Sequence, residues 1–346
     1  MMKVLLVSPL PPPSGGMARW TQLYLSICNR HGIEASVVNT NLSKKRANRM
    51  NRSFTFGDEI KRSIRIIKDL DKKIKSEKPD IIHICSPCSK IGVIRDLLCV
   101  LKARKIPVVF HCHCNIEDQA KSKISQIILH KIVKKSKKII VLNSKSKKII
   151  DSIEMNKAII IPNFIEDGKV YLKHNISKKI NSILYVGHVK LKKGIKEIYK
   201  VAMEFTDKTF IVVGPVQELP EDIKTPKNVK LIGEVNHDLI ESYMEKADVF
   251  LFPSYTEGFA NVMLEAMASG LPIIASDVGA NKDMIGSFGG IIVPVKDCKA
   301  IKNAINIIEN PEVRYSMSSW NTERVKSNYT LSTIIPILKN CYGECI

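Results

Sequence analysis

The sequence predicts an α/β protein of two domains, each with a sheet flanked by helices. Short apolar runs of the kind that form buried strands alternate with stretches whose apolar residues recur at helical spacing. The stretch 249–285 shows this best: a strand stopped by Pro253 is followed by a helix closed by Gly270 and then by a second strand. With 346 residues, the chain is long enough for two separate cores; one large domain is the less favoured alternative.

In the first half, apolar runs predict strands at residues 2–8, 33–40, 80–85, 108–113, 139–142 and 159–163. Prolines end the first strand, and Gly15 and Gly16 precede a helix that begins near Met17. A glycine pair there lets a ligand approach the backbone at a helix N-terminus. A basic helix is predicted over residues 116–135. It either packs its isoleucine stripe on the sheet, which we favour, or lies on an anionic membrane.

In the second half, the same criteria predict strands at residues 183–187, 210–213, 229–233, 249–252, 273–276 and 291–295. Between them lie helical patterns, including one that begins near Ile195 and one whose apolar face starts at Phe259. The last helix is expected over residues 331–342.

The positive charge is confined to one half of the chain. The formal net charge is +20, and residues 1–165 hold 32 of the 54 Lys and Arg but only 12 of the 34 Asp and Glu. The first half is therefore expected to meet an anionic partner, either phosphates or an acidic membrane surface. Part of it is the basic segment 41–58, which is either a solvated loop or a binding patch. No run of about 18 apolar residues is present, so the expected location is the cytoplasm.

Cysteines and histidines cluster at two predicted strand ends. Cys85-x2-Cys88 follows one strand, and His111-Cys112-His113-Cys114 ends another. If the two ends are neighbours, they could present zinc ligands. Ordinary buried thiols are the preferred interpretation, because nine cysteines without a targeting signal indicate a reducing compartment. The sequence analysis therefore predicts no metal site.

Two glutamates flank the start of the helix after Pro253. Glu257 lies in the loop beyond a strand end, where open α/β sheets bind ligands, and Glu265 lies within the helix, off its apolar face. Two solvated acids on a surface helix would show the same pattern. The longer motif PS-x2-EGF-x5-EAMASGLPIIAS, however, resembles the signature of retaining glycosyltransferase family 4, the glycosyl transferases of group 1, which have the GT-B fold.

That resemblance implies two Rossmann-like, doubly wound domains with parallel sheets that face a central cleft. On this chain they would be an acceptor-binding domain at residues 1–165 and a nucleotide-sugar-binding domain at residues 166–330. A C-terminal helix, residues 331–346, would pack back on the first domain.

The resemblance also implies roles for particular residues. Glu257 would face the donor sugar and Glu265 the ribose. Lys193, and His188 in place of the family's arginine, would neutralise the diphosphate. Beside the acceptor, His113 is the predicted catalytic histidine and His111 its alternative, because the HCHC run leaves the register open. The remaining contacts would come from backbone positions: to the donor from Gly16, Gly187, Gly258, Phe259, Ala260 and Asn261, and to the acceptor from Gly15.

The function implied is transfer of a sugar, with retention, from a UDP- or GDP-linked donor to a glycan or lipid-linked glycan. Such an enzyme would work at the cytoplasmic face of the membrane in polysaccharide assembly and would need no cofactor. We find no Asp-x-Asp motif of the metal-dependent kind, so transfer is expected to be metal-independent. The alternatives are a nonhydrolysing sugar-nucleotide epimerase or phosphorylase on the same fold, or a basic protein that binds nucleic acid.

Overall fold

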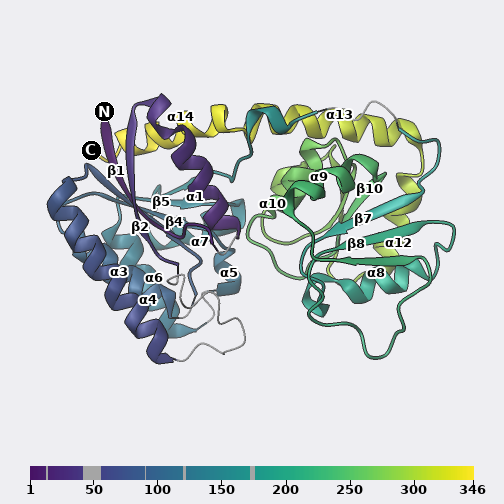
Figure 1. The fold of residues 1–346 in the computed structure, drawn as a ribbon, viewed down its shortest axis with the longest axis horizontal. Helices are drawn as coiled ribbons and strands as arrows, with labels where there is room; N and C mark the ends of the chain where they lie inside the picture. The colour runs from purple at the N-terminus through teal and green to yellow at the C-terminus, as the bar shows by residue number, and fades with distance from the viewer. Residues whose placement is uncertain (13–14, 42–55, 90, 120–121, 172–175) are drawn as a thin grey trace. The chain divides into compact units, whose positions relative to one another are not determined.

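The computed structural model describes residues 1–12, 15–41, 56–89, 91–119, 122–171 and 176–346. The chain forms two compact units (Figure 1). Unit 1 comprises Met1–Phe164 together with Leu331–Ile346, and unit 2 comprises Ile165–Thr330. Both chain ends therefore belong to unit 1. Most of the basic segment 41–58, including Lys44, Lys45, Arg46, Arg49 and Arg52, lies outside the described residues.

Unit 1 is built on a six-stranded parallel sheet in the order β2-β1-β3-β4-β5-β6. Its strands are β1 (Met2–Ser8), β2 (Ile33–Asn39), β3 (Ile81–Ser86), β4 (Val108–Cys112), β5 (Lys138–Val141) and β6 (Ala158–Ile160). The chain runs outward from β1 to β2 and then returns to build the other side of the sheet. The winding direction thus reverses between β1 and β3, which is where doubly wound sheets bind ligands at their carboxyl ends.

Helices cover both faces of this sheet. One face carries α3 (Phe56–Glu77), α4 (Gly92–Lys102), α6 (Lys123–Lys135) and α7 (Ser144–Ile153), whose apolar residues share one core. The other face carries α1 (Gly16–Ile27), a 3-10 turn at Cys28–His31, and α14 (Leu331–Gly343) (Figure 1). Ile334, Ile335, Leu338 and Tyr342 bury α14 in that second core. The prediction that the C-terminal helix returns to the first domain is confirmed.

The basic helix predicted over residues 116–135 is wrong as one element. The structure has a short helix α5 (Ile116–Gln119) and then α6, which begins after Ser122. The Ser122 hydroxyl accepts a hydrogen bond from the backbone N–H of Ser125 at 3.1 Å, which is the usual N-cap arrangement. Ile116 precedes Ile124 by eight residues, about two helical turns, so helical periodicity did not reveal the start signal between them.

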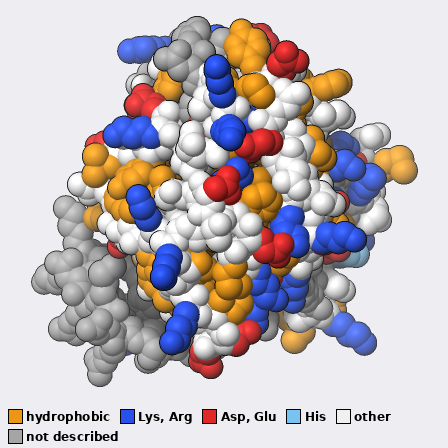
Figure 2. Space-filling view, turned by 90° about the vertical axis from the view of Figure 1, so that its right-hand side faces the viewer, with side chains coloured by type: hydrophobic (Ala, Val, Ile, Leu, Met, Phe, Trp, Pro, Cys, Tyr) orange, Lys and Arg blue, Asp and Glu red, His pale blue; other side chains and the backbone are white. Residues whose placement is uncertain are grey.

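Unit 2 repeats the architecture, with the strand order β12-β11-β10-β7-β8-β9. The strands are β7 (Ser182–Val186), β8 (Thr209–Val213), β9 (Val229–Gly233), β10 (Val249–Phe252), β11 (Ile273–Ser276) and β12 (Gly290–Val293). The flanking helices are α8 (Ile195–Ala202), α9 (His237–Lys246), α10 (Asn261–Ala268), α11 (Asn281–Ile285), α12 (Cys298–Ile307) and α13 (Pro311–Asn328). Here the winding reverses between β7 and β10. The face drawn in Figure 2 mixes blue, red and orange side chains, so no single sign of charge dominates it.

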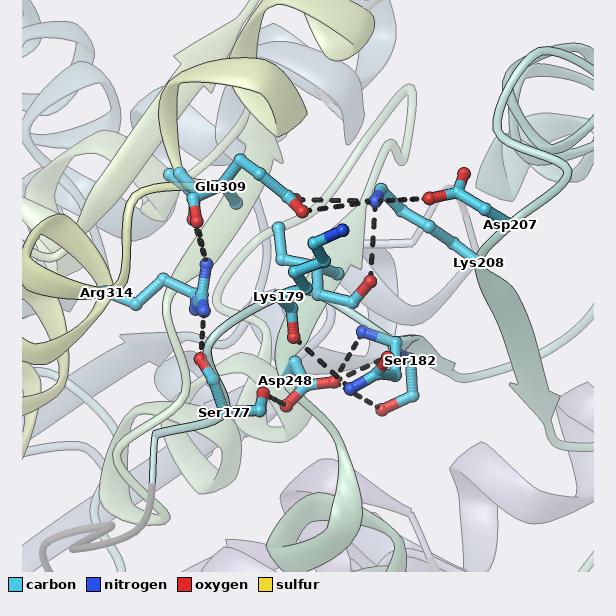
Figure 3. A network of polar contacts seen from close by, with 11 residues as sticks. Ser177, Lys179, Ser182, Asp207, Lys208, Asp248, Glu309 and Arg314 are labelled. Carbon is cyan, nitrogen blue, oxygen red and sulfur yellow. Dashed lines mark hydrogen bonds and ion pairs between the residues drawn. The ribbon is translucent and has the colours of Figure 1, made fainter.

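A network of polar contacts, some of them buried, lies at the amino ends of β7 and β10 in unit 2 (Figure 3). Asp248, just before β10, accepts hydrogen bonds from the Ser177 hydroxyl at 2.5 Å and from the Ser182 backbone at 3.0 Å. Arg314 on α13 is fully buried and donates to the carbonyls of Ile308 and Glu309 at 2.7 and 2.6 Å. Both terminal nitrogens of the Arg314 guanidinium thus have carbonyl partners, since its other terminal nitrogen donates to the Ser177 carbonyl, and such partners lower the cost of burying a charge. The network fixes the start of β7 and of β10, the two strands that lead to the site.

Candidate functional site

The candidate site of unit 2 begins where two neighbouring strands end. β7 and β10 pair directly in the sheet, although some 60 residues of sequence separate them. After β7 the chain turns through Gly187, a 3-10 turn at Leu191–Lys193, and Gly194 into α8. After β10 it runs through Glu257 into α10. Both loops therefore lie at the reversal point of the sheet, the expected position for a ligand.

At this point Lys193 and Glu257 form an ion pair. Their side chains are 22% and 13% exposed, so the pair is largely sheltered but remains open to solvent. An incoming anion would compete with the Glu257 carboxylate for the Lys193 ammonium, and a sugar hydroxyl could take the place of Lys193 on Glu257. The pair can thus receive an anionic group and a hydroxylated group side by side.

Glycines let the loops around this pair approach closely. Gly194 has φ +82°, and a Cβ there would overlap the carbonyl group of Pro253. Gly279 has φ +52°, and a Cβ there would overlap the carbonyl oxygens of Glu257 and Gly258. The Ala280 N–H also donates to the Gly258 carbonyl at 3.0 Å. The position of Glu257 is therefore set by backbone contacts from the loops after β7 and β11, and other residues at these glycine positions would disturb it.

The first turn of α10 supplies a second anion-binding feature. Ala260 is its N-cap residue, and its carbonyl accepts from the N–H groups of Met263 and Leu264 at 3.0 and 3.1 Å. Amides in the first turn of a helix have no acceptor within the helix and lie at the positive end of its dipole. Gly258, Phe259 and Asn261 are part-exposed beside this turn. At the other end of α10, Gly270 has φ +68°, as predicted for its C-cap.

Glu265 lies further along α10, and its carboxylate faces α9. Its Oε1 is 3.5 Å from Nε2 of His237, the first residue of α9, and its side chain is 18% exposed. Sequence reasoning did not find His237. Its only signal is the strand–turn–helix context after β9, which places the start of α9 at the same edge of the sheet.

His188 follows Gly187 and has an exposed side chain. The Tyr185 hydroxyl donates to the His188 carbonyl at 2.9 Å, which anchors the backbone and leaves the imidazole to solvent. Gly214 packs its α-carbon against the Gly187 carbonyl, so the turns after β7 and β8 also lie close together. His188 therefore belongs to the same edge as Lys193.

In unit 1, the predicted glycines stand at the start of α1. Gly15 is the N-cap residue, and its carbonyl accepts from the Arg19 N–H at 2.9 Å. Both glycines are exposed, and a Cβ at Gly15 would meet no atom within 4 Å. The backbone there is accessible to a ligand, next to the reversal point between β1 and β3.

The two predicted histidines differ in exposure. His111 on β4 is fully buried, whereas His113, just past the strand end, is part-exposed. Their rings stack with centroids 3.8 Å apart. Burial lowers the pKa of His113 to about 3, so its imidazole is neutral at physiological pH. A neutral ring can exchange hydrogen bonds with a hydroxyl group. Of the two side chains only His113 is part-exposed, although its Nε2 atom is buried and has no hydrogen-bond partner among the described residues.

Two models of protein families match this chain. The model described as Glycosyltransferase Family 4 matches residues 14–169, and the model described as Glycosyl transferases group 1 matches residues 169–324. The chain belongs to this family of GT-B glycosyltransferases. The predicted fold class is confirmed by the two doubly wound sheets and by the solved structures that share them.

Similar proteins include UDP-Gal:alpha-D-GlcNAc-diphosphoundecaprenol alpha-1,3-galactosyltransferase of Escherichia coli. It is 26% identical over 324 residues, which cover 82% of each chain. Sucrose-phosphate synthase from Thermosynechococcus elongatus has the same fold, with a TM-score of 0.79, 17% identity and 99% of both chains covered. Anabaena Alr3699/HepE, solved in complex with UDP and glucose, superposes with a TM-score of 0.71 and 15% identity over 99% of this chain and 100% of that one.

The sequence of this glycosyltransferase contains one Asp-x-Asp string, Asp69-Leu70-Asp71. It lies in the middle of α3 rather than at a strand end. Leu70 is fully buried, and Asp71 pairs with Lys75 at 2.7 Å and Lys102 at 2.9 Å. These two lysines lower the pKa of Asp71 to about 2. The negative charge of the Asp71 carboxylate is thus already neutralised by two lysines, and these ion pairs have a structural role.

Proposed function

We propose that this glycosyltransferase moves a sugar from a UDP-sugar to a sugar carried on a polyprenyl diphosphate, with retention of configuration, during assembly of a cell-surface polysaccharide. The Lys193–Glu257 pair beside the N-terminus of α10 carries the proposal, because it offers a cation, helix amides and a carboxylate at one strand edge. The Escherichia coli relative supports it, since that enzyme is named for a UDP-sugar donor and an acceptor linked to diphosphoundecaprenol.

In the donor complex, the diphosphate replaces the Glu257 carboxylate as the partner of the Lys193 ammonium and lies against the first turn of α10. The released Glu257 carboxylate accepts hydrogen bonds from the sugar hydroxyls, and Glu265 accepts from the ribose. His188 adds a hydrogen bond to the diphosphate, and the Gly187 turn leaves room for it. These groups favour the leaving diphosphate most strongly as its negative charge develops, which is how they would lower the barrier to transfer.

Retention follows if the acceptor attacks from the side on which the diphosphate leaves. The bond between the sugar C1 and the UDP oxygen breaks as the bond from the acceptor oxygen to C1 forms. The acceptor proton passes to the departing β-phosphate, so no enzyme base is required. The relative's name supports this outcome, because a UDP-galactose donor and an alpha-linked product have the same configuration.

We assign binding of the acceptor to unit 1. Gly15 and Gly16 present backbone amides, and the neutral His113 imidazole hydrogen-bonds the reacting sugar as a catalytic contact. His111, being buried, supports the His113 ring through their stacking rather than binding the acceptor itself. Charge on the diphosphate is met by Lys193 and the helix amides, so the proposal needs no cation for transfer.

The proposal includes a contact between unit 1 and a membrane surface, because the acceptor is a lipid. Three adjacent helices of unit 1 expose large apolar side chains at helical spacing: Ile60 and Ile64 on α3, Ile94, Leu98 and Leu101 on α4, and Ile124 and Ile127 on α6. Lys123, Lys131 and Lys134 line a shallow groove with Ile127 on α6. Apolar side chains that can enter the lipid, flanked by lysines that attract anionic headgroups, suit a peripheral contact at the inner face of the membrane. Among the described residues, no helix is long and apolar enough to cross a bilayer.

Vesicle flotation tests this contact. We expect the protein to bind vesicles that contain anionic lipid, and the substitution Ile127→Glu to reduce binding about tenfold by placing a charge in the interface. Ile307→Glu on α12 is the matched control, since both isoleucines are 56% exposed. Equal loss in both variants, or equal binding to neutral vesicles, would refute the membrane surface.

The transfer itself is tested by incubating the protein with radiolabelled UDP-sugars and a polyprenyl diphosphate-linked sugar. We expect labelled lipid from at least one donor, an alpha anomeric signal in the product, and the same rate after treatment with EDTA. An epimeric UDP-sugar formed without an acceptor product would instead indicate an epimerase, and free UDP formed without labelled lipid would indicate a hydrolase. A beta anomeric signal in the product would contradict retention of configuration but not the transfer itself.

A further inference from the structure

The HCHC run at the end of β4 places its two residue types on opposite faces of the sheet. Successive side chains of a strand point to opposite sides. His111 and His113 therefore contact Trp20 of α1, on the face covered by α1 and α14. Cys112 and Cys114 lie in the core on the other face, together with Cys88. The histidines and the cysteines of this run therefore cannot bind the same ion.

A different set of three ligands does come together, on the Trp20 face. His83 and Cys85 are two residues apart on β3, and Cys85 pairs in register with His111 on β4. One ligand atom from each of the three residues lies within 4.8 Å of the others, and all three side chains are buried. His83 Nε2 and His111 Nδ1 are 3.3 Å apart, which is long for a hydrogen bond.

We propose that His83, Cys85 and His111 bind a zinc ion. Two nitrogens that coordinate one tetrahedral zinc at 2.0–2.1 Å lie about 3.3 Å apart, as these two already do. A sulfur on the same ion lies about 3.6 Å from each nitrogen, so the Cys85 thiol has at most about 1 Å to move. Two imidazoles and one thiolate are ligands that zinc accepts, and a water can occupy the fourth position.

The surroundings of His83 fit the same assignment. The other ring nitrogen of His83, Nδ1, is 2.6 Å from the Tyr342 hydroxyl on α14. A hydrogen bond from Nδ1–H to this oxygen leaves Nε2 without a proton and directed at His111, the usual arrangement around a metal-bound histidine.

The ion would add a bond between side chains of two strands that already pair in the sheet. It would join β3 to β4, and the Tyr342 hydrogen bond would extend the connection to α14. Through the stacked His111 ring it would also hold His113 in place. The role is structural and separate from the metal-independent transfer proposed above, and metal content can be measured whether or not that proposal is correct.

The test is the metal content of the full-length protein after incubation with Zn²⁺ and desalting. We expect about one zinc per chain, lost in Cys85→Ser and retained in Cys112→Ser, a buried thiol on the other face of the same sheet. Cobalt in place of zinc should give a sulfur-to-cobalt charge-transfer band in the wild type that is absent from Cys85→Ser. Tyr342→Phe should keep the site but weaken zinc binding about 10- to 100-fold.

Either of two outcomes would overturn the site. These are wild-type protein that retains no zinc and shows no charge-transfer band with cobalt, or metal lost from Cys112→Ser but kept in Cys85→Ser. The latter would place the ion among the three cysteines of the opposite core. Because the cobalt spectrum needs only wild-type protein, the proposal can fail even if the Cys85 variant does not fold.

Discussion

At the scale of single residues, the site depends on a pairing that the sequence did not reveal. Lys193 and Glu257 were each predicted from a family motif, but nothing in the sequence places them in contact, because 63 residues separate them. The pairing follows from the sheet order, in which β7 and β10 are neighbours. His83 was not predicted as a ligand for a related reason. It lies near His111 because β3 and β4 pair in a particular register, and the sequence of one strand does not reveal this register.

Replacing Glu257 with Gln should separate binding from catalysis. Without the carboxylate, Lys193 is free for the diphosphate, so UDP should bind at least as tightly as to the wild type. The sugar loses a charged acceptor, and kcat should fall about 100-fold. Calorimetry with UDP and initial rates of transfer measure the two effects. Glu245→Gln, at an exposed position of α9, is the control, and weaker UDP binding to Glu257→Gln would contradict the competition between carboxylate and diphosphate.

At the scale of secondary-structure elements, the buried strands were the most predictable part of the chain. Parallel strands covered on both faces form continuous apolar runs, and each of the runs identified corresponds to a strand. Helix ends were less predictable, because a capping residue such as Ser122 can interrupt a continuous apolar stripe. The loops that shape the site were the least predictable, since Gly279 acts through the carbonyls of a loop some 20 residues away.

The close approach at Gly279 can be tested with a pair of alanine variants. Gly279→Ala adds a Cβ that overlaps the Glu257 carbonyl, so the loop must move; we expect transfer to fall about tenfold or more, with a loss of about 1–3 kcal/mol in stability. Gly233→Ala is the matched control, since Gly233 also has positive φ, +82°, but has open space around it. Comparable loss of transfer in both variants would show that backbone strain, rather than contact with Glu257, is responsible.

At the scale of the whole molecule, the chain divides into two units, of which unit 2 is one continuous stretch and unit 1 is formed by two separate stretches of sequence. Unit 1 is completed only when α14 packs beside α1, after all of unit 2 has been added to the chain. The sequence predicted this return only through resemblance to a family. The charge asymmetry was visible in the composition, but the exposed apolar stripes of α3, α4 and α6, which give that charge a proposed membrane partner, required the structure.

The contribution of α14 can be measured with two neighbouring positions. Leu338→Ala removes a fully buried side chain and should destabilise unit 1 by about 2–4 kcal/mol, whereas Ile337, which is 39% exposed, should tolerate alanine with a far smaller loss. Hydrogen exchange under increasing urea can follow each unit separately. The loss is expected in the strands of unit 1, and a loss confined to the strands of unit 2 would contradict the assignment of α14 to the first core.

The central claim is that the diphosphate of the donor binds at the carboxyl ends of β7 and β10, on Lys193 and the first turn of α10. Calorimetric titration of the protein with UDP tests it most directly. We predict that UDP binds the wild type, that Lys193→Ala raises the Kd at least about tenfold, or about 1.4 kcal/mol, and that Lys192→Ala, at the exposed neighbouring position, changes it little. UDP binding of equal strength in the wild type and Lys193→Ala would contradict the claim.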